Sequence, residues 1–262
     1  MIGSNDKLPF TIHLEELRNR LIKCFIAVGV GFVGSFGFKE KLFDILVKPL
    51  IDVMEAGDKL IFTALPEAFF TYLKVSFLSG IMLSSPIILY QFWMFVAPGL
   101  YEKERRMLIP IVILSSFFFI GGSLFGYFMV FPLGFKFFLS FATETIQPLP
   151  SMKEYLGFSA KLLLAFGLVF ELPLVLTFLA RLGVVSVSFL KKNRKYALLL
   201  FFVGAAILTP PDVITQILMA LPLMVLYEIS IIGARLFGKK KSEETKTEED
   251  KKGADDSDSE AT

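Results

Sequence analysis

The sequence predicts an all-α polytopic membrane protein with six transmembrane helices, and three observations support this fold class. Of its 262 residues, 54% are hydrophobic and 20% are charged, whereas soluble domains have about 45–50% apolar and about 25% charged residues. The mean hydropathy is +0.64. The charges occur in blocks between apolar runs, several of which approach the roughly 20 helical residues needed to cross a bilayer core. Lipid is therefore the first expected partner.

Six apolar runs are candidates for the transmembrane helices. They are residues 21–38, 69–96, 107–135, 162–180, 197–208 and 213–234. The run 197–208 would be only ~18 Å long as a helix, and the charge-free part of the last run, 213–227, only ~22 Å. We therefore expect a short last hairpin, with its turn at residues 209–212. No cleavable signal peptide is expected, because the first apolar run follows acidic residues and leads to no small-residue cleavage pattern.

The distribution of basic residues predicts the orientation of the chain. Lys and Arg precede the first run, fill the loop after the second and precede the fifth, and cytoplasmic loops typically carry this excess. An even number of spans places both termini on the same side, so we expect both in the cytoplasm. The basic residues are Lys7, Arg18 and Arg20, then Lys103, Arg105 and Arg106, then Lys191, Lys192, Arg194 and Lys195.

Three regions follow from this reading. Residues 1–20 form a cytoplasmic amphipathic segment, residues 21–237 the membrane domain, and residues 238–262 a charged tail whose composition predicts disorder. Residues 39–68 form an outer loop with apolar residues at helical spacing, interrupted by Pro49. We expect short amphipathic helices in this loop, lying on the outer face of the membrane.

Composition also excludes several classes of function. A net charge of +2 gives no indication of a nucleic-acid partner. Cys24 and His13 are the only residues of their types, which excludes the usual Cys and His metal sites, and no cofactor is expected. No internal repeat is apparent, which weakens the case for a transporter built from inverted repeats.

One carboxylate lies inside an apolar run. Glu171 is in the fourth run, where an ionised carboxylate costs at least about 2.5–3.5 kcal/mol on insertion scales. Pro173 removes a backbone donor close to it. The favoured interpretation is that Glu171 provides a polar contact for a translocating or bound segment. The alternative is a protonated side chain that forms a hydrogen bond with a neighbouring helix.

Further carboxylates lie within the basic cytoplasmic segments, where they oppose the local charge. Glu15 and Glu16 precede the first run, and Glu102 and Glu104 follow the second. Carboxylates accept paired hydrogen bonds from guanidinium groups, so these residues suit a ligand that carries arginines. The alternative is an intramolecular pair such as Glu16 with Arg20, worth about 0.2–0.5 kcal/mol. Spacing alone does not decide between the two.

Six ordered motifs within residues 8–237 give the chain its resemblance to a known family, the TatC subunit of the twin-arginine protein translocase. The resemblance implies a concave, glove-like bundle of six spans, and it leaves only the tail uncovered. The motifs are His13-Leu14-x-Glu16-Leu17-Arg18-x-Arg20, Ser85-Pro86 with Tyr90-Gln91-x-Trp93, Ala97-Pro98-x-Leu100-Tyr101, Glu104-Arg105-Arg106, Phe170-Glu171-x-Pro173 and Thr209-Pro210-Pro211-Asp212.

The same resemblance implies a function and a set of roles. It implies a receptor in a prokaryotic inner membrane that binds twin-arginine signal peptides of folded precursors, recruits TatA- and TatB-type single-span subunits, self-associates, and uses the proton-motive force. The implied roles are signal binding for Glu16, Glu104, Arg18, Phe95 and Leu100, an intramembrane polar role for Glu171, partner contact for Thr209 and Gln216, and a structural role for Pro49.

Two other classes of function compete with the receptor. One is a proton-coupled secondary transporter with Glu171 as its relay, and the other is an intramembrane enzyme. The absence of repeats argues against the transporter. The lack of paired acids, of a His site and of a nucleophile with its base argues against the enzyme.

Overall fold

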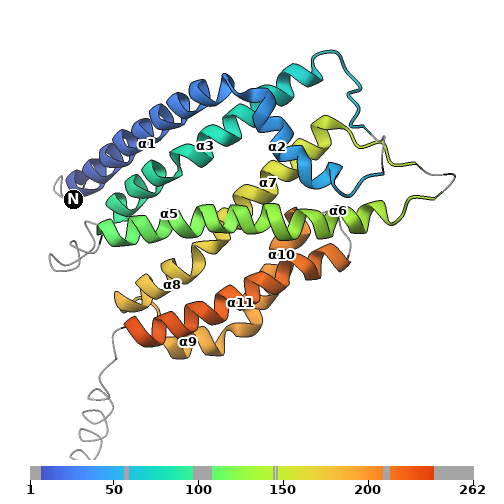
Figure 1. The fold of residues 1–262 in the computed structure, drawn as a ribbon. Helices are drawn as coiled ribbons and strands as arrows, with labels where there is room; N and C mark the ends of the chain where they lie inside the picture. The colour runs from blue at the N-terminus through green and yellow to red at the C-terminus, as the bar shows by residue number, and fades with distance from the viewer. Residues whose placement is uncertain are drawn as a thin grey trace, which may run out of the picture.

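The protein is described by a computed structural model that covers residues 7–55, 59–96, 108–143, 145, 147–208 and 213–238. Within these ranges the regular secondary structure is helical, and an isolated β-bridge joins Ile61 and Ser151. The helices are α1 (Lys7–Phe36), α2 (Lys39–Ile51), α3 (Glu67–Val96), α5 (Leu108–Phe125), the π-helix η2 (Gly126–Val130), α6 (Phe131–Leu139), α7 (Met152–Phe170), α8 (Leu172–Arg181), α9 (Val187–Lys192), α10 (Arg194–Leu208) and α11 (Val213–Phe237) (Figure 1).

Five helical segments in the described ranges are long and apolar enough to cross a membrane. They are Thr11–Phe36, Glu67–Val96, Leu108–Leu139, Met152–Arg181 and Val213–Phe237. The fifth predicted span, residues 197–208, corresponds to α10, which has 15 residues and is therefore ~22 Å long. The prediction that this span is short is confirmed. The predicted turn at 209–212 lies outside the described residues, as do residues 239–262 of the predicted tail, 238–262.

The last span is longer than predicted. The charge-free part of the last apolar run ends at Tyr227, which predicted a short helix. Helix α11 instead continues to Phe237 and has 25 residues. The carboxylate that interrupted the count, Glu228, accepts a hydrogen bond of 2.7 Å from Arg194 of α10, so the helix continues past it. The shortness of the hairpin therefore comes from α10 alone.

Two other helices begin earlier than the apolar runs predicted. Helix α1 starts at Lys7 and includes most of the segment expected to precede the first span, with no break at residue 20. Helix α7 starts at Met152, ten residues before the predicted run, because the exposed Lys161 lies within the helix and does not end it. Charged side chains mark the limits of an apolar run but not those of a helix.

The third span contains a π-helical turn. Helix α5 passes into η2 at Gly126 and then into α6, whose first turn contains Pro132. Proline cannot donate a backbone hydrogen bond, and a π-turn is one of the known ways in which a helix accommodates such a defect. The span therefore continues to Leu139, beyond its predicted end at residue 135.

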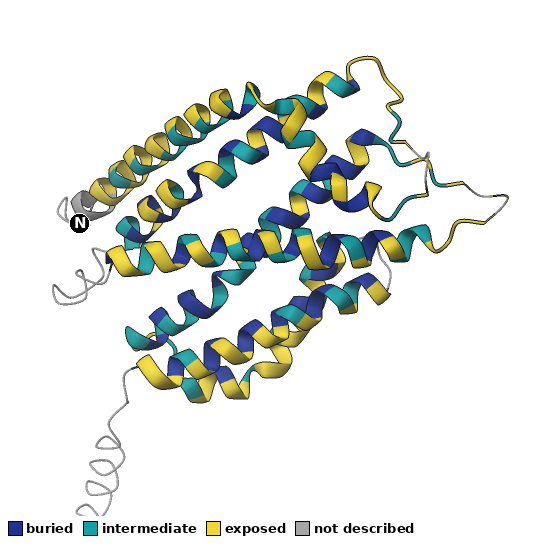
Figure 2. Ribbon diagram, viewed as in Figure 1, coloured by how far each residue is buried: buried dark blue, intermediate teal, exposed yellow. Residues whose placement is uncertain are grey.

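Helix α1 packs on α3 through a close approach of the two backbones. A Cβ atom added to Gly31 would lie 2.7 Å from the carbonyl oxygen of Gly80, and Ser84 donates a hydrogen bond of 2.7 Å to the carbonyl of Ala27. The other side of α1 is exposed, as Figure 2 shows, and carries large apolar side chains such as Phe25. The close packing fixes the N-terminal part of α1 beside the last turns of α3.

The outer loop forms one helix, α2, with Pro49 inside it. The expectation of several helices interrupted at this proline is wrong for the described residues. Because Pro49 lacks an N–H, the carbonyl of Ile45 loses its helical donor, and the hydroxyl of Tyr127 donates to that carbonyl at 2.5 Å. The hydroxyl of Tyr155 donates to the next carbonyl, that of Leu46, at 2.6 Å. Pro49 is therefore part of the attachment of α2 to the bundle.

A second attachment joins the outer loop to the start of α7. The buried carboxylate of Glu67 accepts hydrogen bonds from the backbone N–H and hydroxyl of Thr63 and, at 2.9 Å, from the hydroxyl of Ser151. It also accepts from the backbone N–H groups of Ala64 and Lys153. Five donors compensate for the burial of this carboxylate.

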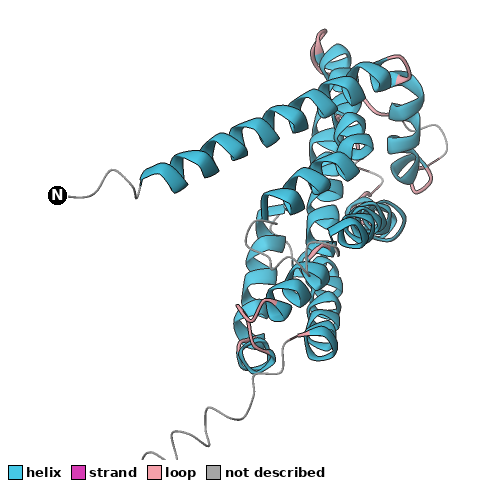
Figure 3. Ribbon diagram, turned by 90° about the vertical axis from the view of Figure 1, so that its left-hand side faces the viewer, coloured by secondary structure: helices cyan, strands magenta, loops and turns pink. Residues whose placement is uncertain are grey.

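The bundle has a concave side. Figure 3 shows α1 running away from the stack of the other helices, so that the angle between them opens toward the N-terminal end of α1. This shape agrees with the predicted glove-like bundle.

Candidate functional site

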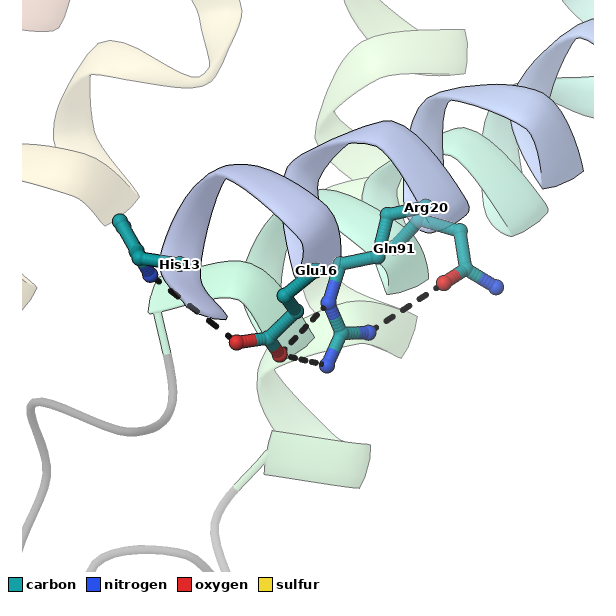
Figure 4. Close-up of polar contacts among 4 residues, drawn as sticks. All are labelled: His13, Glu16, Arg20 and Gln91. Carbon is teal, nitrogen blue, oxygen red and sulfur yellow. Dashed lines mark hydrogen bonds and ion pairs between the residues drawn. The ribbon is translucent and has the colours of Figure 1, made fainter. Parts of the chain in front are cut away.

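The N-terminal part of α1 carries a cluster of polar side chains that contact the end of α3. We call it the Glu16 cluster. Its members are His13, Glu16 and Arg20 of α1 with Gln91 of α3, all drawn in Figure 4, and Phe95 of α3.

The carboxylate of Glu16 is held in place from one side. Arg20 donates to its Oε1 atom from Nε at 3.0 Å and from Nη2 at 2.5 Å, and Nη1 of Arg20 donates to Gln91 at 3.3 Å. Gln91 is buried on α3, so it fixes the guanidinium that in turn fixes Glu16. The intramolecular pair that sequence spacing left open is therefore formed.

The second carboxylate oxygen of Glu16 is the one available to a ligand. The contact recorded for this oxygen among the described residues is with the Nδ1 atom of His13, at 3.9 Å. The His13 ring stacks on Phe95, with ring centroids 4.3 Å apart and the planes at 20°. Glu16 retains 29% side-chain exposure. A carboxylate bound by an arginine on one oxygen still has acceptor positions for a second guanidinium.

Arg18 and Glu15 lie outside the Glu16 cluster. Their side chains are 70% and 67% exposed, and Nη2 of Arg18 is 3.9 Å from Oε1 of Glu15. Of the two adjacent acids, the structure places Glu16 beside α3 and leaves Glu15 in the open. Leu100, Glu104 and Thr209, which the sequence also singled out, lie outside the described residues.

A second polar group lies inside the bundle. In the Glu171 network, Nε1 of Trp93 donates to the hydroxyl of Ser115 at 3.0 Å, and Ser115 donates to Oε2 of Glu171 at 2.5 Å. All three side chains are buried. The other oxygen, Oε1, has no hydrogen-bond partner in the described part of the chain. Glu171 also marks the break between α7 and α8, because Pro173 opens the next helix.

Gln216 forms an internal contact in the last hairpin. Its Nε2 atom donates to the carbonyl of Phe202 on α10 at 2.8 Å. This bond ties α11 to the short helix and leaves the second amide hydrogen and the carbonyl oxygen of Gln216 for another partner.

The sequence alone did not identify the polar partners of the two carboxylates. Ser115 was not singled out, and Gln91 and Trp93 were noted only as part of a motif, without a role. A signal for Ser115 existed, since a buried carboxylate in a membrane needs a donor on a facing helix. The pairing of Ser115 with Glu171, 56 positions apart, required the fold.

These features define a multi-pass helical membrane protein with one positioned carboxylate at an end of the bundle and one buried in its interior. The comparisons agree. The family model for the Sec-independent protein translocase protein (TatC) matches residues 12–222. Two similar proteins carry the name Sec-independent protein translocase protein TatC. The one from Desulforapulum autotrophicum is 69% identical over 92% of this chain and 89% of its own length. The one from Escherichia coli K12 is 40% identical over 88% of this chain and 90% of its own length.

A solved structure is similar as well. The crystal structure of a twin-arginine translocase receptor, TatC, superposes with a TM-score of 0.77 at 42% identity, covering 86% of this chain and 98% of the other. The chain belongs to the TatC family and is a multi-pass protein translocase component.

Proposed function

We propose that the chain is the receptor component of a twin-arginine translocase, which binds the signal peptides of folded precursors at the cytoplasmic face. The supporting observation is the Glu16 cluster. It offers a carboxylate oxygen without a hydrogen bond from the described residues, and the opposite oxygen is fixed by Arg20. A prearranged acceptor of this kind suits a guanidinium better than an ammonium group, because the planar fork of Arg matches a carboxylate.

The family relationship supports the same proposal. Glu104 and Leu100 belong to the segment of sequence that joins α3 to α5, and the last turns of α3 contribute to the Glu16 cluster. The second carboxylate for the second arginine of the signal comes from Glu104 in this proposal, with Phe95, Leu100 and Arg18 completing the surface. The direct test is binding of a twin-arginine peptide against a twin-lysine control to the chain in membranes. Equal binding of the two peptides would contradict the proposal.

The proposed location is a prokaryotic inner membrane with both termini in the cytoplasm. Reporters fused after Phe38 or at Ser151 should report the outer side, and reporters at Lys103, Asn193 or the C-terminus the cytoplasm, because basic loops stay inside. The measurement is reporter activity in cells. A C-terminal reporter on the outer side would refute this orientation.

Assembly with TatA- and TatB-type single-span subunits, and self-association in the same complex, are also part of the proposal. Thr209 and Gln216 at the outer end of the hairpin are the proposed contacts, because α10 is too short to cross the membrane alone and Gln216 keeps free hydrogen-bonding positions. A photo-crosslinker at position 216 should link to a single-span subunit. A crosslinker at Phe77, exposed on α3, is the control, and links found only there would contradict the assignment.

A further inference from the structure

A groove runs between α5 on one side and α8 and α11 on the other, at the end of the bundle where α1 begins and α11 ends. We call it the α5–α8 groove. Its volume is about 500 Å³, within the range of ~300–1,000 Å³ that is typical of sites for small molecules. Its walls are almost entirely apolar. They include Ile111 and Phe118 of α5, Leu174 and Phe178 of α8, and Ile229 and Phe237 of α11.

One charged residue lines this groove. Arg181 is the last residue of α8, only half-buried, and makes no hydrogen bond or ion pair with any described residue. No acidic residue is among the lining residues of the groove. A cation at the end of a helix that lines an apolar groove matches a ligand with an anionic head and a hydrocarbon tail. Basic pockets between helices on the cytoplasmic side are known to bind anionic lipid headgroups.

Two amphipathic molecules could reach this groove in a receptor of the proposed kind, a signal peptide and a phospholipid. The positive charge of Arg181 distinguishes between them. A twin-arginine signal also carries an apolar stretch, but its head is cationic and would bring its charge toward Arg181. Like charges at close range disfavour that occupant. An anionic phospholipid has the complementary charge, and the lipid bilayer already surrounds the groove.

We propose that the α5–α8 groove binds one acyl chain of an anionic phospholipid, whose phosphate is held by Arg181. The acyl chain would lie against Phe178. The ring of Phe178 meets the ring of Trp93 edge to face, with the ring centroids 4.8 Å apart. Trp93 is the donor to Ser115 and so belongs to the Glu171 network. A lipid in the groove would therefore pack directly behind the residues that hold Glu171.

The single tryptophan of the chain provides the test. Trp93 is the only Trp in the sequence and is 2% exposed, so bulk lipid does not reach it. Bromine on an acyl chain quenches indole fluorescence over short distances only. We expect phosphatidylglycerol with brominated chains to quench Trp93 in reconstituted full-length protein, and brominated phosphatidylcholine to do so more weakly. Unbrominated phosphatidylglycerol should relieve the quenching.

Two variants and a control isolate the groove. Arg181→Gln should reduce the preference for phosphatidylglycerol about five-fold, the factor for one basic residue near an anionic membrane surface. Leu114→Phe, which narrows the groove from α5, should reduce quenching by both lipids. Arg235→Gln is the control, because Arg235 is an exposed cation of α11 that does not line the groove. The emission maximum without bromine reports whether each variant is folded.

Three results would overturn the proposal. The first is equal quenching by the two brominated lipids in the unmodified protein. The second is an equal loss of preference in Arg181→Gln and Arg235→Gln, which would indicate a general surface charge effect. The third is relief of the quenching by a twin-arginine peptide, which would assign the groove to the signal.

Discussion

Replacing Glu16 by alanine is expected to weaken the binding of a twin-arginine peptide about 30-fold or more. Removing one member of a close, partly buried charge pair costs about 2–5 kcal/mol, and a factor of ten corresponds to about 1.4 kcal/mol. The measurement is crosslinking or pull-down of the peptide in matched membranes, with a twin-lysine peptide for comparison.

The structure adds a reason for a large effect. Without Glu16, the guanidinium of Arg20 stays beside the site, held by Gln91, and its charge is no longer neutralised. The variant would therefore lose an attraction and gain a repulsion toward an incoming arginine. Folding should not suffer, since a pair at i,i+4 on a helix contributes only about 0.2–0.5 kcal/mol.

The chain contains a matched control. Glu15 is the adjacent acid on the same helix, but it is 67% exposed and lies near Arg18 instead of α3. Glu15→Ala should therefore have a much milder effect than Glu16→Ala. Glu104→Ala should resemble Glu16→Ala if Glu104 accepts the other arginine. Unchanged binding in the Glu16 and Glu104 double variant, with the arginine preference intact, would overturn the receptor mechanism.

The sequence predicted the fold class and the number of spans because lipid exposure imposes long apolar runs. It misplaced the ends of the helices, since Lys161 and Glu228 interrupt apolar runs without interrupting helices. The π-turn before Pro132 was also missed. A proline predicts a local defect, but the form of that defect depends on the helices packed around it.

The carboxylates of the candidate site were found in the sequence because their charge is anomalous in its context. The hydrogen-bond partners of these carboxylates could not be found in the same way, except for Arg20. Arg20 lies four residues after Glu16, and this spacing made the Glu16–Arg20 pair one of two interpretations. Gln91 reaches Arg20 across 71 positions. That contact depends on the close approach of α1 and α3 at Gly31 and Gly80, which no local pattern reports.

The Glu171 network leaves two mechanisms to separate. In one, the carboxyl is a hydrogen-bond acceptor that maintains the break between α7 and α8. In the other, the carboxyl gains and loses a proton during export. The observed bonds favour the first, because Ser115 uses its one hydrogen on Glu171 and accepts from Trp93, so the three groups form a directed chain. The unpaired Oε1 atom is the observation that keeps the second open to test.

Glu171→Gln is therefore expected to retain much more export than Glu171→Ala. Glutamine keeps a carbonyl oxygen for the Ser115 hydroxyl and nearly the same volume. Alanine leaves a cavity and a buried hydroxyl without its acceptor, and losing one such acceptor costs about 1–3 kcal/mol. Ser115→Ala is the matched variant, because it removes the donor to Glu171 and the acceptor of Trp93 together. It should shift the Trp93 emission and reduce export to a level between those of the other two variants. The measurement is export of a precursor by protein inserted at normal levels, and equal, complete inactivation by Gln and Ala would indicate that ionisation of Glu171 is required.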